Sequence, residues 1–293
     1  MRATLVDLME RRVVGGCEAA ADHVYSGHGC LSADGKLLYL CENFRANLSS
    51  PSAKKVSGRV IVRDALTLKP LREMPTHGSW VHNVMFMKKD RFLVVGMEAT
   101  EGPSGSPPSG GQILFLSAAD GKLLGHYLPS DPHWSLNHFD LTPDEELVVA
   151  AQTKYLLPGD GKVYRDYTAP ILFGRMGETE WKKVMPEPLR DHMLRNHTVC
   201  VDRIRHRAIV AHDVGCRVSV WDLGTHDLVG MLEIENPRGL AISLDGSRYL
   251  VTSKAKNLTY VDATSLKVLN TLTGLGPKGL DGPQHITVVP NLA

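Results

Sequence analysis

Long apolar runs, an excess of charge of one sign and paired cysteines are all missing from this sequence. No apolar stretch approaches the roughly 18 residues of a transmembrane helix, so no membrane span is expected. Basic residues number 33 and acidic residues 32, which leaves a formal net charge of +1, and no block of lysine and arginine stands out. A chain without a basic surface is not expected to bind nucleic acid.

The five cysteines form neither a disulfide framework nor a structural zinc motif. Their number is odd, their spacing is irregular, and no C-x-x-C pair occurs. A disulfide between Cys30 and Cys41 is the one alternative that the sequence leaves, because both residues fall on strands expected to be neighbours. For Cys30 and Cys200, which closely follow histidines, burial as small apolar side chains is favoured over metal ligation.

What the sequence does contain is a repeated pair of strands. Each copy has a short apolar strand, a polar turn and a second, more apolar strand, which is the pattern of a β-hairpin. The copies read HGCLSADGKLLYL from His28, HNVMFMKKDRFLVVG from His82, HFDLTPDEELVVAAQ from His138, HTVCVDRIRHRAIVAHD from His197 and GLAISLDGSRYLVTS from Gly239. A shorter last copy, HITVVPN, begins at His285.

A third strand and usually a fourth follow each hairpin, as in GRVIVRDALTLKPLREM and CRVSVWDLGTHDLVGMLEI. Four-stranded units that recur in this way predict an all-β fold, a β-propeller, and residues 1–293 are expected to form one such domain. A β-sandwich would not repeat the unit so regularly. Six blades are favoured and seven is the alternative. The N-terminal stretch reads as outer strands, so the two termini are expected to share one blade and close the ring.

Histidines recur near the start of the first strand of the copies, at His28, His82, His138, His197 and His285. Equivalent positions of a propeller form a ring at one mouth of its channel, so these five imidazoles are predicted to converge there. The remaining copy offers Arg238 beside Gly239 instead. Neutral imidazole is the commonest protein ligand of transition metals. The competing interpretation is that each histidine only binds the backbone of a neighbouring blade, and that blade duplication repeated it.

A second set of polar residues is expected to flank the ring, because the second strand of each hairpin returns to the same face. In this role, which orients ligand rings, the sequence places Glu42, Asn43, Glu98, Gln152, His212 and Arg238. The longer connections emerge on this face too, which suits a small-molecule substrate or a partner protein.

The first hairpin, GHGCLSADGKLLYLCEN, resembles the DUF1513 family of bacterial proteins of unknown function. The shared motif falls on Gly27, His28, Gly29, Ser32, Asp34, Gly35, Leu38, Tyr39, Glu42 and Asn43. The segments VHNVMF, NHFDL and GPQHI are similar to later family motifs, whereas the family need not have a histidine at the position of His197. The resemblance implies a periplasmic propeller, often associated with iron-uptake genes.

Two features depart from that family. Its usual twin-arginine export signal and additional N-terminal strands are missing, and the start MRATLVDLMERRVVGG lacks the apolar core of a signal peptide. A chain that is complete as given is therefore expected in the cytoplasm, and a chain that begins after a removed signal in the periplasm.

These observations predict a propeller that holds a transition metal in its histidine ring. Iron is favoured by the resemblance and copper by the richness in imidazole, with zinc as a further candidate. A metal-dependent oxidoreductase or oxygenase that acts on a small molecule is one alternative. A metal-free scaffold for protein interactions is the other.

Overall fold

The computed structural model describes residues 2–44, 58–78, 80–88, 91–97, 110–153, 168–275 and 285–288. The chain groups into two compact units. Unit 1 comprises Met1–Asn137, Met176–Thr179 and Leu292–Ala293, and unit 2 comprises His138–Arg175 and Glu180–Asn291. Glu98, one of the predicted flanking residues, lies outside the described ranges.

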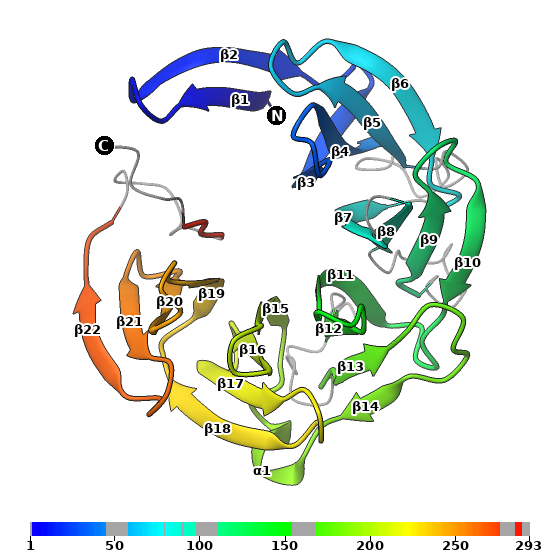
Figure 1. The fold of residues 1–293 in the computed structure, drawn as a ribbon. Coiled ribbons are helices and arrows are strands. Elements are labelled where there is room, and N and C mark those ends of the chain that lie inside the picture. The colour runs from blue at the N-terminus through cyan, green and yellow to red at the C-terminus, as the bar shows by residue number, and fades with distance from the viewer. Residues whose placement is uncertain are drawn as a thin grey trace, which may run out of the picture. The chain divides into compact units, whose positions relative to one another are not determined.

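Unit 1 contains a two-stranded sheet and two four-stranded sheets, all antiparallel (Figure 1). The strands are β1 (Arg2–Asp7) and β2 (Arg12–Glu18); β3 (His23–Leu31), β4 (Leu37–Phe44), β5 (Arg59–Asp64) and β6 (Pro70–Pro75); and β7 (Val81–Met87), β8 (Phe92–Met97), β9 (Ile113–Ser117) and β10 (Leu123–Tyr127). Strands that follow one another in the chain are neighbours in each sheet.

Three four-stranded sheets of the same order make up unit 2 (Figure 1). The first strand, β11, begins in unit 1 and continues into unit 2. The elements are β11 (Trp134–Leu141), β12 (Leu147–Thr153), β13 (Ile171–Gly174) and β14 (Lys182–Val184); α1 (Glu187–Arg190); β15 (Asn196–Asp202), β16 (Arg207–His212), β17 (Arg217–Asp222) and β18 (Leu228–Glu233); and β19 (Pro237–Ile242), β20 (Arg248–Ser253), β21 (Leu258–Asp262) and β22 (Val268–Leu272).

These sheets confirm the predicted β-propeller fold. Over the described ranges, five consecutive four-stranded meanders are present, and β1 with β2 supplies the strand pair expected at the N-terminus. The last predicted copy is represented by residues 285–288, to which no strand is assigned. The closing of one blade by both termini therefore stays a prediction.

Apolar residues at alternate positions of the strands fill the space between successive sheets. In unit 1, Tyr39 and Val60 of one sheet belong to the same buried cluster as Val84 and Leu93 of the next. In unit 2, Trp221, from the VSVWD segment, is fully buried in such a cluster. Packing of this kind fixes each sheet against its neighbour in the same unit.

All five cysteines are free, so the disulfide considered between Cys30 and Cys41 is not formed. Cys30 lies opposite Tyr39 in the pairing of β3 with β4. Cys41 is therefore a diagonal neighbour, and such Cα atoms lie roughly 7–8 Å apart. A disulfide usually joins Cα atoms about 4.4–6.8 Å apart.

Candidate metal centre

An irregularity of strand pairing marks the histidine positions. In β7, Val81 pairs with Met97 and Asn83 with Gly96, which leaves His82 as an extra residue. A bulge of this kind bends the strand and re-aims the side chain that it carries, and such bulges are common next to functional sites.

The same irregularity recurs in three other first strands. In β15 the extra residue is His197, between the pairs of Asn196 with His212 and Thr198 with Ala211. In β3 the register shifts between Tyr25 and Gly29, the interval that contains His28. In β19 it shifts between Pro237 and Leu240, the interval that contains Arg238 and Gly239. Each of these sheets thus interrupts its ladder at the position that the sequence repeat singled out.

The sequence pattern predicts that these histidines lie near the start of their strands, and the structure places only some of them there. His82 and His197 are the second residues of β7 and β15. His28 and His138 lie well inside β3 and β11, because those strands continue further toward their N-terminal ends. In β3, the register shift between Tyr25 and Gly29, and not the strand end, marks the position of His28.

Unit 1 brings His28 and His82 together. Their ring centroids are 5.0 Å apart, and the ring planes are inclined by 48°. The two side chains come from β3 and β7, the first strands of neighbouring sheets in the same unit.

Unit 2 brings together His138, His197 and His285, here called the histidine trio. Ring centroids are separated by 5.4 Å from His138 to His197, 5.4 Å from His138 to His285 and 6.0 Å from His197 to His285. His138 and His197 are buried, with 5% and 6% of their surface exposed, whereas His285 is exposed. A ring nitrogen of His138 lies within 4.8 Å of one of His285.

Gly239 explains why one copy has no histidine at this position. A Cβ atom on Gly239 would lie 2.9 Å from the Cα atom of His285 and 2.5 Å from Oγ1 of Thr252. Backbone contacts this short leave no room for any side chain. The glycine at position 239 therefore leaves the space into which the segment carrying His285 packs.

Asn43 and Glu42, two of the predicted flanking residues, bind other strands of unit 1 through their side chains. The buried amide of Asn43 donates from Nδ2 to the carbonyl oxygen of Val81 at 2.7 Å and accepts the Val81 amide at 2.9 Å. This clamp fixes the backbone directly before His82. Glu42, also fully buried, accepts from Arg59 at 2.7 and 2.9 Å and lies 3.7 Å from Arg63. A buried carboxylate needs such counter-charges.

His212 holds the blade of His197 through both of its ring nitrogens. Nδ1 lies 2.6 Å from Oδ1 of Asn196, and Nε2 lies 2.7 Å from Oγ of Ser219. Ser219 Oγ also accepts from Nε1 of Trp221 at 2.6 Å, and Asn196 Nδ2 donates to the carbonyl oxygen of Ala169 at 2.7 Å. This chain of bonds assigns the proton of His212 to Nδ1.

Burial, with a smaller contribution from the nearby His192, lowers the pKa of His212 to about 3. The neutral ring is therefore the stable form at neutral pH. Since both nitrogens are occupied, His212 acts as a spacer that positions Asn196, the residue directly before His197.

The remaining flanking residues also lie at the ends of unit 2 strands. Arg238 Nε is 3.3 Å from Oδ2 of Asp213, and both side chains are 4% exposed. Gln152, near the end of β12, is 8% exposed. Sequence reasoning missed Asn196, although an Asn-His pair occurs at Asn196–His197 and again at Asn137–His138, with both asparagines buried. That recurring dipeptide was the available signal.

The comparison with protein families decides where the chain belongs. The model of DUF1513, described as a protein of unknown function, matches residues 2–277. The chain belongs to the DUF1513 family. The match covers nearly all of both units and includes four of the five histidines, since His285 follows its end.

Other comparisons bear on the fold of this DUF1513 protein alone. No curated protein matches it. A chain from a crystal structure of a mitotic checkpoint complex, a WD40 propeller, is similar to it with a TM-score of 0.67 and 13% identity, over 92% of this chain and 71% of that one. As 1498 chains of solved structures match, the fold does not select a function. No helix in the described ranges is long and apolar enough to cross a membrane.

Proposed function

We propose that this DUF1513 protein binds a transition metal ion through the histidines that recur along its repeat. The observation that supports the proposal is the histidine trio of unit 2. Three imidazoles from chain-distant positions lie with ring centroids no more than 6.0 Å apart. Imidazole nitrogen suits iron, copper and zinc, with iron and copper the leading candidates.

The spacing of His138 and His285 is compatible with ligation after small side-chain adjustments, and the ring of His197 lies beside both. Nitrogen ligands of a tetrahedral ion lie about 3.3–3.4 Å apart when each bond is about 2.0–2.1 Å. Ring nitrogens of His138 and His285 lie within 4.8 Å of one another, so each of these two rings has to move by less than about 1 Å to bind a common ion. His285 is exposed, which gives an ion a path of entry.

The test is the metal content of the protein, purified without a histidine tag and without chelators. We expect close to one equivalent of iron, copper or zinc per chain after titration. The double variant His138→Gln, His285→Gln should lose it while its far-ultraviolet circular dichroism stays β-rich. His206→Gln, an exposed histidine of unit 2, is the matched control and should keep the metal. Absence of uptake by the wild-type protein would contradict the proposal and favour a metal-free scaffold.

A metal-dependent oxidoreductase is the second candidate. Three nitrogen ligands leave coordination positions of iron or copper open to a small molecule. His285 is exposed, so a small molecule can reach an ion held by the trio. Azide added to the copper-loaded protein distinguishes the two candidates. A changed visible spectrum indicates an open position, and an unchanged one indicates a saturated binding site.

A further inference from the structure

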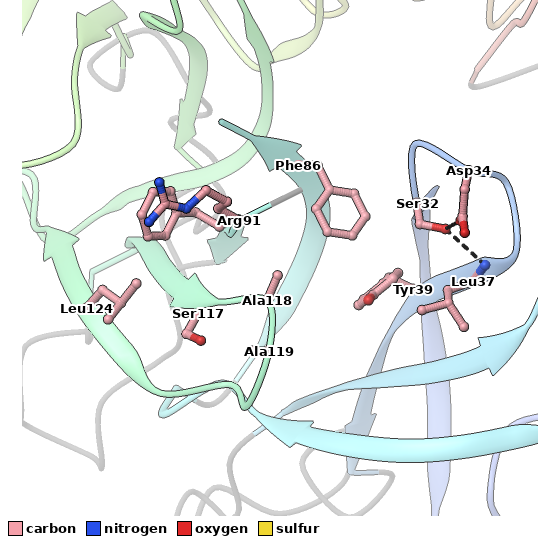
Figure 2. Close-up of a pocket in the computed structure, with 11 residues that line it drawn as sticks. Ser32, Asp34, Leu37, Tyr39, Phe86, Arg91, Ser117, Ala118, Ala119 and Leu124 are labelled. Carbon is pink, nitrogen blue, oxygen red and sulfur yellow. Dashed lines mark hydrogen bonds between the residues drawn. The ribbon is translucent and has the colours of Figure 1, made fainter. Parts of the chain in front are cut away.

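Unit 1 has a concave feature beside the polar turns of its hairpins, and its lining residues are separate from the histidine positions of the repeat. It is a cavity of about 660 Å³, here called the turn-side pocket. Figure 2 shows that its lining side chains come from two neighbouring sheets, β3–β6 and β7–β10. Ligand sites for small molecules usually measure roughly 300–1,000 Å³ and combine apolar walls with a few polar groups.

Aromatic rings form the apolar part of the turn-side pocket. Tyr39 and Phe86 meet edge to face with their ring centroids 4.7 Å apart, and Figure 2 shows the two rings between the sheets. Phe92 and the exposed Leu124 extend this surface. The edge-to-face pair holds Phe86 in place, so the site is preformed and offers a planar ligand a flat apolar contact.

Two cationic side chains lie at the Phe92 end of the pocket. The guanidinium carbon of Arg91 lies 5.7 Å from the ring centroid of Phe92, and Nζ of Lys88 lies 5.6 Å from it. Within the described ranges no carboxylate is paired with Arg91. A guanidinium held against an aromatic ring keeps its fork of N–H donors available for a carboxylate.

The acidic and basic groups around the rest of the pocket are already engaged. Asp34 accepts from Ser32 Oγ at 2.7 Å and from the amide of Lys36 at 3.1 Å, and its carboxylate lies 3.6 Å from Nζ of Lys36. Arg72 donates to the carbonyl oxygen of Ala118 at 2.8 Å. Arg91 is therefore the charged side chain of the lining that is available to bind an anionic ligand.

From these contacts we infer that the turn-side pocket binds a planar organic anion, an aromatic carboxylate, with the ring against Tyr39, Phe86 and Phe92 and the carboxylate on Arg91. The inference is independent of the metal proposal, because none of its lining residues is a proposed metal ligand.

Isothermal titration calorimetry with 2-naphthoate tests the inference. We expect saturable binding with a dissociation constant of about 1 mM or lower, the range for a ligand of this size. The variant Arg91→Gln should weaken binding by about tenfold or more, since a charge-assisted hydrogen bond is lost. The neutral alcohol 2-naphthalenemethanol should bind the wild-type protein more weakly than 2-naphthoate does, and it should not distinguish wild type from variant.

Two further variants keep the outcome decisive. Ala119→Phe places a ring at the mouth of the pocket and should block both probes without removing a charge. Arg190→Gln changes an exposed arginine of unit 2 and should leave 2-naphthoate binding unchanged. No saturable heat with the wild-type protein overturns the inference, and so does an Arg91→Gln or Ala119→Phe variant that binds as well as the wild type.

Discussion

Two histidines of the same sheet show how the surroundings of a residue decide its role. His197 is the extra residue of a bulge and its ring lies among those of His138 and His285. His212 is paired with Asn196 at the edge of the same bulge, and both of its nitrogens are hydrogen-bonded inside the protein. The first is placed to bind a ligand, whereas the second has no nitrogen left for one.

The burial of His212 predicts a loss of stability in acid. Its folded-state pKa of about 3 lies below the ordinary 6.5, so below pH 6.5 only the unfolded chain takes up this proton. The stabilisation is complete above the ordinary pKa and is lost as the pH falls toward 3, at up to about 1.4 kcal/mol per pH unit. Urea unfolding of metal-free protein between pH 7.5 and 4.5 measures this slope.

The His212→Gln variant should be less stable at neutral pH and should show a shallower pH dependence. His206→Gln, in an exposed position of the same unit, serves as the control and should keep the wild-type slope. Equal slopes for wild type and His212→Gln would show that other groups carry the acid sensitivity.

At the scale of the strand, the recurring bulge links the fold to the candidate site. Asn43 is hydrogen-bonded to the backbone of Val81, which precedes the bulged His82. Asn196, which precedes the bulged His197, is hydrogen-bonded to His212. In both cases a buried polar side chain fixes the residue that enters the bulge. A buried amide that loses such partners costs about 1–3 kcal/mol, so these contacts hold the bulges in one conformation.

Gly239 gives a prediction at this scale. Gly239→Ala would place a methyl group against the His285 backbone and Thr252. It should lower the free energy of unfolding by about 1–3 kcal/mol, as overpacking does, and should weaken metal binding by displacing His285. Metal titration and urea unfolding of the same preparation measure both effects. Gly125→Ala is the control, because its new Cβ atom meets only Phe115, at 3.9 Å. It should change neither the free energy of unfolding nor metal binding. Equal behaviour of the two variants would contradict the close approach of Gly239 to His285.

For the whole molecule, the question is whether the histidines of the two units serve one site. Unit 1 contributes the pair of His28 and His82, and unit 2 contributes the histidine trio. The repeat predicts a single ring of five, and this stays a prediction. Each group contains two histidines from the first strands of neighbouring sheets in the same unit, and the trio adds His285 from a segment to which no strand is assigned.

Metal stoichiometry of the double variant His28→Gln, His82→Gln decides this. A single ring predicts close to one ion per wild-type chain and, in the variant, an affinity weakened by about tenfold or more. Separate sites predict that the trio binds its ion with unchanged affinity. His126→Gln, an exposed histidine of unit 1, controls for the loss of a surface imidazole. Thermal unfolding with and without added metal provides a second readout, since a ligand of the folded state raises the melting temperature.

The sequence by itself determined the hairpins, the four-stranded sheets, the propeller class and the recurrence of His28, His82, His138 and His197. These follow from turn residues and from alternation of apolar residues, which are local properties of the chain. Only the tertiary structure decided that His28, His82 and His197 stand at irregularities of strand pairing, that Glu42 binds Arg59, that His212 supports Asn196, and that Gly239 makes room for His285. Such features depend on register between strands and on contacts between segments far apart in the chain, which no local pattern specifies.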